Sequence, residues 1–195
     1  MSQEKCRCEW PGQDPLYLAY HDWEWGVPVL DDTKLFEFLV LETFQAGLSW
    51  ITILRKRENF RMALDHFDCK KIAKYNQDKI DQLLGDSSIV RNRLKILATI
   101  SNAQAFIRIQ KEYGSFSHYI WSFVDGKPIQ NSFKSIKELP ARTALSDTIS
   151  LDLKKRGFKF VGSTVVYAHM QATGMVNDHV ITCFRYREIQ ALGQH

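Results

Sequence analysis

The chain has 195 residues, 45% of them hydrophobic and 25% charged, which is ordinary for a globular protein. Its net charge of +4 is compatible with binding to nucleic acid but does not establish it. No apolar run reaches membrane-spanning length and the N-terminus lacks the hydrophobic core of a signal peptide, so we expect a cytoplasmic protein without a membrane partner.

Helical periodicity dominates the whole chain, and no linker or repeat divides it, so we expect a single unit over residues 1–195. The shorter helices are expected over residues 15–24, 32–46, 49–64, 78–84, 115–123, 146–156 and 162–173. A long helix is expected to begin at Ser87 or Ser88 and to run to Tyr113, with Gly114 at its end. Residues 129–142 are expected to form a loop, and Thr164-Val165-Val166 is the best of the few strand candidates. The predicted fold class is therefore all-α.

The stretch from Glu42 to Trp50 combines a carboxylate, a flexible turn and a large aromatic ring. Glu42 lies on the apolar face of the helix predicted over 32–46, where an unpartnered carboxylate is costly to bury. Ala46-Gly47 should end that helix, Ser49 can cap the next one, and Trp50 stands in its first turn. This pattern is compatible with a pocket for a flat ligand that donates hydrogen bonds.

Further aromatic residues are concentrated near the N-terminus. With Glu42 and Trp50 they form a candidate pocket group made of Trp10, Tyr17, Tyr20, Trp25, Glu42 and Trp50. Most buried aromatic residues serve only as core, so each of these residues alone is more often packing than part of a ligand site.

Cysteines and histidines at the two ends of the chain form a candidate metal site. Cys8 and His21 lie near one end, and His179 and Cys183 form a His-x3-Cys pair near the other. Two thiolates and two imidazoles are a ligand set that zinc prefers in closed structural sites. The spacing alone favours unrelated thiols and surface histidines, and Cys6 competes with Cys8 for the ligand role.

A basic segment runs from Leu153 to Gly162, with two predicted helices on either side of a turn between Gly157 and Gly162. Glycines expose backbone N–H groups, and the following helix offers its N-terminus, so the segment could hold a phosphate without reading sequence. The same composition suits a plain helical hairpin with a solvated basic face, and the pattern favours neither interpretation.

Taken together, these motifs resemble the 3-methyladenine DNA glycosylase I family over nearly the whole chain. The matching segments are Cys8-Glu9-Trp10, Asp14-Pro15-Leu16-Tyr17, Tyr20-His21-Asp22, Glu24-Trp25-Gly26, Gln45-Ala46-Gly47-Leu48-Ser49-Trp50, Lys56-Arg57-Glu58-Asn59, Trp121-Ser122-Phe123, Lys154-Lys155-Arg156-Gly157-Phe158-Lys159-Phe160-Val161-Gly162 and Asn177-Asp178-His179.

The resemblance implies a helix-hairpin-helix glycosylase fold with one structural zinc ion per chain, which joins terminal regions 1–30 and 175–185. The zinc ligands of the family fall on Cys8, His21, His179 and Cys183, so the resemblance selects Cys8 over Cys6.

The implied activity is hydrolysis of the N-glycosidic bond of 3-methyladenine in double-stranded alkylated DNA, by a monomer that releases the free base. Glu42 and Tyr20 become the candidate catalytic residues, and Trp50, Trp10, Tyr17 and Trp25 the base-binding ones. Gly47 and Leu48 are expected to fill the space left by a flipped nucleotide, and Gly157, Lys159 and Gly162 to hold a phosphate. The alternative is a non-enzymatic module that binds damaged DNA.

Three features depart from the family pattern. Phe44 stands where a polar residue, often glutamine, is expected, so we expect it to alter the pocket wall or the turn at Gly47. Related glycosylases carry an aspartate shortly after the hairpin, but here no acid follows Gly162 until Asp178. The region beyond Cys183 does not resemble the tails of the family, and no function is assigned to it.

Overall fold

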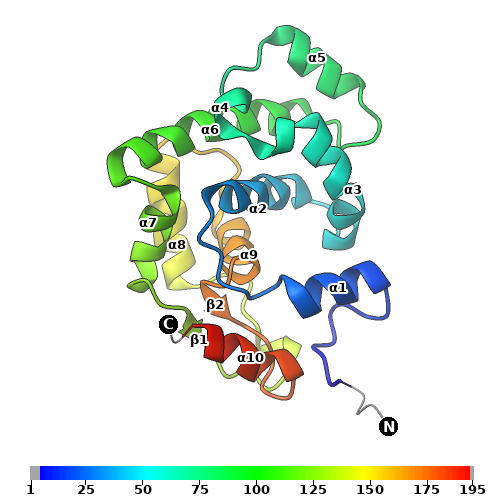
Figure 1. Ribbon diagram of the computed structural model, residues 1–195, viewed down its shortest axis with the longest axis vertical. Coiled ribbons are helices and arrows are strands. Elements are labelled where there is room, and N and C mark those ends of the chain that lie inside the picture. The colour runs from blue at the N-terminus through cyan, green and yellow to red at the C-terminus, as the bar shows by residue number, and fades with distance from the viewer. Residues whose placement is uncertain (1–4, 194–195) are drawn as a thin grey trace.

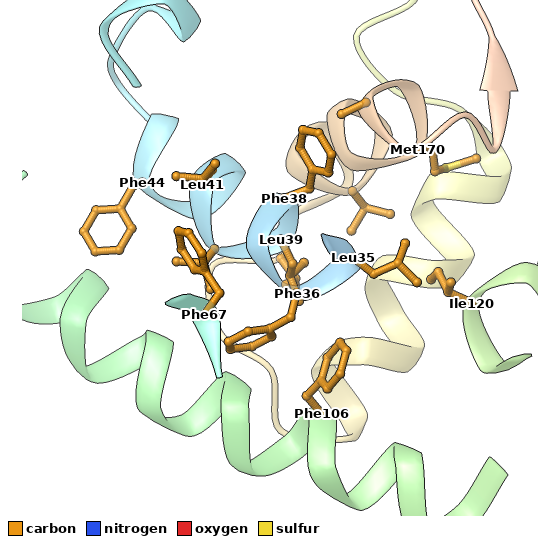
Figure 2. Packing of buried hydrophobic residues seen from close by; sticks show 14 of the residues in the cluster. Leu35, Phe36, Phe38, Leu39, Leu41, Phe44, Phe67, Phe106, Ile120 and Met170 are labelled. Carbon is orange, nitrogen blue, oxygen red and sulfur yellow. The ribbon is translucent and has the colours of Figure 1, made fainter. Parts of the chain in front are cut away.

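Helix α2 (Asp32–Gln45) lies at the centre of the fold (Figure 1). The computed structural model describes residues 5–193. Every residue of α2 from Leu35 to Phe44 is buried, because α3, α6, α7 and α9 all pack against it. A helix that is enclosed on all sides is expected to be mostly apolar, and Figure 2 shows leucine and phenylalanine side chains of α2 that meet this condition. The buried polar residues of α2 are Glu37, Glu42 and Thr43.

The other elements are arranged around α2, as Figure 1 shows. The helices are α1 (Pro15–Trp23), α3 (Trp50–Ala63), α4 (Cys69–Ile72), α5 (Gln77–Gly85), α6 (Arg93–Tyr113), α7 (Phe116–Trp121), α8 (Ala144–Lys155), α9 (Ser163–Ala172) and α10 (Phe184–Leu192). The 3-10 turns are η1 (Asp65–Phe67), η2 (Ser122–Val124) and η3 (Ile136–Glu138), and the strands are β1 (Ile129–Gln130) and β2 (Val176–Asn177). The all-α prediction is confirmed.

Side-chain caps set the ends of the helices. Asp14 accepts hydrogen bonds from the first backbone N–H groups of α1, and Asp31 accepts one from Lys34 at the start of α2. Gly114 adopts a φ of +85° and ends α6, as its sequence predicts. These caps fix where α1 and α2 begin, and both helices contribute to the candidate site.

Three local predictions are wrong. The long helix begins at Arg93 rather than at Ser87 or Ser88, because the Asn92 side chain accepts a hydrogen bond from the N–H of Lys95 and caps α6 there. The strand candidate Thr164-Val165-Val166 is helical, as part of α9, in agreement with the helix predicted over 162–173. The expected loop over 129–142 contains β1 and η3, and β1 pairs in parallel with β2.

Two helices were missed by sequence reasoning. Helix α4 is only four residues long, and helix α10 lies beyond Cys183. In Figure 1, α10 and α1 lie at the same end of the molecule, although they are at opposite ends of the chain. Within residues 5–193, no helix is both long and apolar enough to cross a membrane.

Candidate active site and metal centre

An aromatic cavity of about 220 Å³ lies between α1, α2, α3 and α9. Its lining residues are Trp10, Tyr17, Tyr20, Trp25, Glu42, Gln45, Trp50, Ile136, Leu139, Ala168 and Gln171. All six residues of the predicted pocket group are in this lining. The structure therefore brings together side chains that are spread over forty positions of the sequence.

The aromatic rings of the cavity pack edge to face. Trp10 is the centre of the group, with its ring centroid 4.9 Å from that of Tyr17 and 5.1 Å from that of Trp25. The Tyr20 ring lies 5.5 Å from the Trp50 ring. Interlocked rings of this kind are rigid, and they leave flat apolar faces for a ligand.

Some buried polar atoms around this cavity have no hydrogen-bond partner within residues 5–193. Glu42 is 4% exposed, and its Oε2 accepts no hydrogen bond; the indole Nε1 of Trp10 and that of Trp50 donate none. Buried polar groups are almost always paired, so three unpaired atoms around one cavity suit a ligand that both donates and accepts. Burial raises the pKa of Glu42 to about 8.

The two tyrosines of the cavity stay protonated. Burial raises the pKa of Tyr20 well above its usual range, and the nearby Glu42 raises it further. The same two causes, in the same order, raise the pKa of Tyr17. Both residues therefore present neutral hydroxyl groups to a ligand at any physiological pH.

The turn between α2 and α3 matches its prediction. Gly47 has a φ of +84°, and Leu48 is 41% exposed. Trp50 begins α3 as predicted, but Ser49 caps the helix only by its position, because its side chain makes no capping hydrogen bond. The buried Lys95 ammonium group donates hydrogen bonds to the carbonyl oxygens of Phe44 (2.8 Å) and Ala46 (2.7 Å). Lys95 thus fixes the turn from its buried side, while the side chain of Leu48 is exposed to solvent.

The expectation that Phe44 alters the pocket wall is wrong, while its effect on the turn at Gly47 stays a prediction. Its side chain is fully buried in the core, with its ring centroid 4.7 Å from that of Phe60, and it does not line the cavity. Figure 2 places Phe44 and Met170 of α9 at opposite ends of the drawn cluster. A phenylalanine suits this fully buried position because its ring packs against another aromatic ring.

The predicted hairpin joins α8 to α9. Gly157 adopts a φ of +96°, and Gly162 caps α9, which carries the cavity residues Ala168 and Gln171. Lys159 is exposed between these two glycines. The turn therefore presents backbone and one free lysine to solvent, and it continues directly into a wall of the cavity.

Asn102 of α6 supports this hairpin, and sequence reasoning missed it. Its amide donates to the carbonyl oxygen of Lys159 (3.0 Å) and accepts from the N–H of the same residue (2.7 Å). Asn102 is completely buried. A buried asparagine in a long helix is the one signal that could have revealed it, because such a residue needs partners.

The candidate metal ligands Cys8, His21, His179 and Cys183 are all buried, and their ligand atoms all lie within 4.8 Å of one another. The Cys183 Sγ is 3.5 Å from both His21 Nε2 and His179 Nδ1, and the Cys8 Sγ is 3.6 Å from His179 Nδ1. Cys6 is exposed and outside the group. The four side chains could hold one metal ion.

The outer nitrogen of each histidine is also fixed. His21 Nδ1 lies 2.8 Å from a carboxylate oxygen of Asp22, and His179 Nε2 lies 3.0 Å from the carbonyl oxygen of Trp25. Partners of this kind set the tautomer so that the other nitrogen can bind a metal. Hydrogen bonds from Cys8, His179 and His21 lower the pKa of Cys183, which favours the thiolate that a metal needs. The arrangement fits a metal centre.

Asp178, the first acid after the hairpin, does not line the cavity. It is 1% exposed, and it accepts hydrogen bonds from Tyr167, Gln171 and Asn131. Of the described residues that line the cavity, only Glu42 carries a carboxylate.

The chain is similar to known proteins over nearly its whole length. The chain is 49% identical to DNA-3-methyladenine glycosylase 1 of Escherichia coli (strain K12), over 92% of this chain and 96% of the relative. It is 48% identical to DNA-3-methyladenine glycosylase of Haemophilus influenzae, over 91% of this chain and 96% of the relative.

Solved structures agree with these relatives. A crystal structure of 3-methyladenine DNA glycosylase I matches with a TM-score of 0.89 and 51% identity, over 92% of this chain and 98% of the other. The Staphylococcus aureus enzyme, described for its recognition of 3-methyladenine, matches with a TM-score of 0.89 and 38% identity, over 91% of this chain and 95% of the other. The family model described as methyladenine glycosylase matches residues 10–186. The chain belongs to the methyladenine glycosylase family.

Proposed function

We propose that the protein is a DNA repair glycosylase that hydrolyses the N-glycosidic bond of 3-methyladenine in alkylated double-stranded DNA. The observation that carries this proposal is the aromatic cavity, in which Glu42 is buried without a partner for its Oε2. The relatives named for this activity, which align over nine-tenths of the chain, support it.

The enzyme needs to contribute little to breaking the glycosidic bond. Methylation at N3 gives adenine in DNA a positive charge, so the electron pair of the glycosidic bond leaves with a base that becomes neutral. Water then supplies a hydroxyl group to the sugar carbon and releases a proton, and an abasic site remains. Because the bond is already weak, binding the extruded nucleotide in a reactive position provides most of what the enzyme must supply.

The hairpin is proposed to hold the DNA. The backbone between Gly157 and Gly162, with Lys159 beside it, binds one phosphate of either strand without reading sequence. The damaged nucleotide then flips out of the stack, at a cost of a few kcal/mol that is lower for a damaged base. Leu48, which is exposed on its turn, fills the space that the nucleotide leaves.

The cavity is proposed to recognise the flipped base. Trp50 stacks on it, and its π face favours a cation. Glu42 accepts a hydrogen bond from the exocyclic amine, and Tyr20 adds a second polar contact, while Trp10, Tyr17 and Trp25 form the remaining walls. A cation at this position also favours the ionised form of Glu42, which burial alone disfavours.

The metal group is proposed to bind one structural zinc ion. Two cysteines and two histidines suit zinc, and the closed, buried arrangement has no open position for a catalytic water. The ion stabilises the contact between the segment before α1 and the segment before α10. We further expect the protein to act as a monomer.

A base-release assay tests the proposal. DNA treated with a methylating agent is incubated with the protein, and the released bases are identified by chromatography. We expect 3-methyladenine in the supernatant and abasic sites in the DNA. Binding to alkylated DNA without any release would identify a damaged-DNA-binding module instead and would refute the glycosylase.

A further inference from the structure

Gln171 of α9 connects the aromatic cavity to a buried polar network behind it. Its side chain lines the cavity, while its Nε2 donates a hydrogen bond of 2.8 Å to Oδ2 of Asp178. Asp178 lies outside the cavity and is 1% exposed. The amide of Gln171 therefore has one end in the network and the other available to the cavity.

The network determines whether the NH2 group or the oxygen of the Gln171 amide faces Asp178. Oδ2 of Asp178 also accepts from the hydroxyl group of Tyr167 (2.6 Å), and Oδ1 accepts from the amide of Asn131 (2.7 Å). A carboxylate that accepts from three donors has no proton to give. Gln171 can satisfy it only by turning its NH2 group towards Asp178, which leaves the amide oxygen for the cavity.

This amide oxygen has no hydrogen-bond partner among residues 5–193, and it is not among the fully enclosed unpaired atoms. It is therefore open to a ligand, as a second acceptor in a cavity whose other acceptor is Glu42. Two acceptors suit a base edge that carries an amine with two hydrogens. A carbonyl group at the same edge would face the Gln171 oxygen and the Glu42 carboxylate, which a cationic base keeps ionised, and neither of these two groups donates a hydrogen bond.

We propose that Gln171 is a second base-binding residue that selects an amine-bearing purine over a carbonyl-bearing one, and that Asp178 is the residue that orients it. The proposal rests on the proposed function, and it adds a basis for preferring 3-methyladenine to 3-methylguanine. Asp178 does not touch the base in this scheme, and its role is to hold the amide of Gln171 in one orientation.

Two variants test the two halves of the proposal. Gln171→Met keeps the length of the side chain but removes the acceptor. In Asp178→Asn, Asn131 still requires an oxygen on its side, so the new amide group replaces Oδ2 and donates to Gln171. The amide of Gln171 then reverses and presents NH2, a donor for a guanine carbonyl, to the cavity.

The readout is the ratio of 3-methyladenine to 3-methylguanine released from methylated DNA, with binding of both free bases measured by tryptophan fluorescence. We expect the ratio to fall about tenfold or more in each variant, the usual effect of one unpaired buried polar group. Tyr167→Phe is the matched control, because it removes a hydrogen bond to the same Oδ2 but leaves the carboxylate, so the ratio should not change.

The outcomes separate the two proposals. If the unmodified protein releases no 3-methyladenine, the proposed function fails. If it does release this base, and Gln171→Met keeps the ratio and both binding affinities, the further inference is wrong. Zinc content and circular dichroism are measured for every variant, because Asp178 is adjacent to His179; if Asp178→Asn does not fold, Gln171→Met alone decides.

Discussion

At the residue scale, Glu42 shows how a site residue can be recognised before any ligand is known. It is buried on the central helix and lines the aromatic cavity, and its Oε2 has no partner in the described chain. Burial of this carboxyl group lowers the stability of the fold, and an apolar residue at the same position would avoid that loss. Such a cost is expected at a functional position, and it makes a stability measurement informative.

Substitution of Glu42 by Gln should stabilise the protein increasingly as the pH rises. The folded carboxyl has a pKa of about 8 against an ordinary value of 4.5, so between these values the folded state keeps a proton that the unfolded state releases. Wild-type stability should fall there by up to about 1.4 kcal/mol per pH unit relative to the variant, and the difference should level off above. Denaturant unfolding at several pH values measures it.

The control for this prediction is Glu9→Gln, at an exposed carboxyl. Its stability difference from wild type should stay flat over the same pH range. A flat difference for Glu42→Gln as well would show that Glu42 is not held protonated in the folded protein.

Lys95 is the second residue whose role can be tested alone. Its buried ammonium group pairs with two carbonyl oxygens at the end of α2, which no backbone N–H satisfies there. Lys95→Met should therefore lower the free energy of unfolding by about 1.5–3 kcal/mol, as for hydrogen bonds to a charged group. Denaturant titration measures this loss, and Lys95→Arg should recover part of it. A fully stable Lys95→Met variant would contradict the assigned role.

At the element scale, periodicity and capping predicted most helices because those signals are local. Gly47 and Gly114 follow the ends of α2 and α6, where the sequence predicts those helices to end. The errors arise where longer-range contacts decide. Strand β1 is two residues long and exists only because β2 lies beside it, and no local pattern reveals such a pair.

The hairpin between α8 and α9 depends on an element that is distant in sequence. Asn102 of α6 holds both backbone groups of Lys159, so Asn102→Ala should loosen the turn that is proposed to bind a phosphate. We expect weaker binding to undamaged duplex DNA, by about tenfold, since both backbone groups of Lys159 lose the partner that fixes them. Binding is measured by fluorescence anisotropy at fixed salt concentration.

Gln104→Ala is the control on the same helix. Gln104 is exposed and bonds the carbonyl oxygen of Ala73, away from the hairpin. Its removal should leave DNA affinity unchanged. Equal losses in the two variants would show that α6 stability, rather than support of the hairpin, controls binding.

At the scale of the whole molecule, the cavity and the metal group illustrate what a single sequence can and cannot provide. Spacing alone disfavoured a metal site, because the spacing of Cys8 and His21 is not a recognised zinc-finger spacing. The other two ligands lie at the opposite end of the chain, and nothing local links them to this pair. Only resemblance to a family joined the two ends, and the structure then placed all four side chains within reach of one ion. Gln171 and Asn102 stayed hidden because their roles depend on tertiary contacts.

The last prediction concerns the metal group and its effect on the stability of the whole fold. The segment before α1 also contacts the first residue of α10, through the hydrogen bond from the N–H of Phe184 to the carbonyl oxygen of Cys6 and through the Lys5 ammonium group over the Phe184 ring. The binding energy of a structural metal counts as folding energy. Cys183→Ser should therefore lose bound zinc, normally about one ion per chain by elemental analysis, and should unfold at a clearly lower temperature.

Cys6→Ser separates loss of the metal from loss of a thiol. Cys6 is exposed and lies two residues from the ligand Cys8, so its substitution should change neither zinc content nor unfolding temperature. Because the cavity residues Trp10 and Trp25 lie next to the metal group, loss of zinc should also weaken binding of 3-methyladenine. A Cys183→Ser protein that is zinc-free, fully stable and still binds the base would show that the four ligands do not support the cavity.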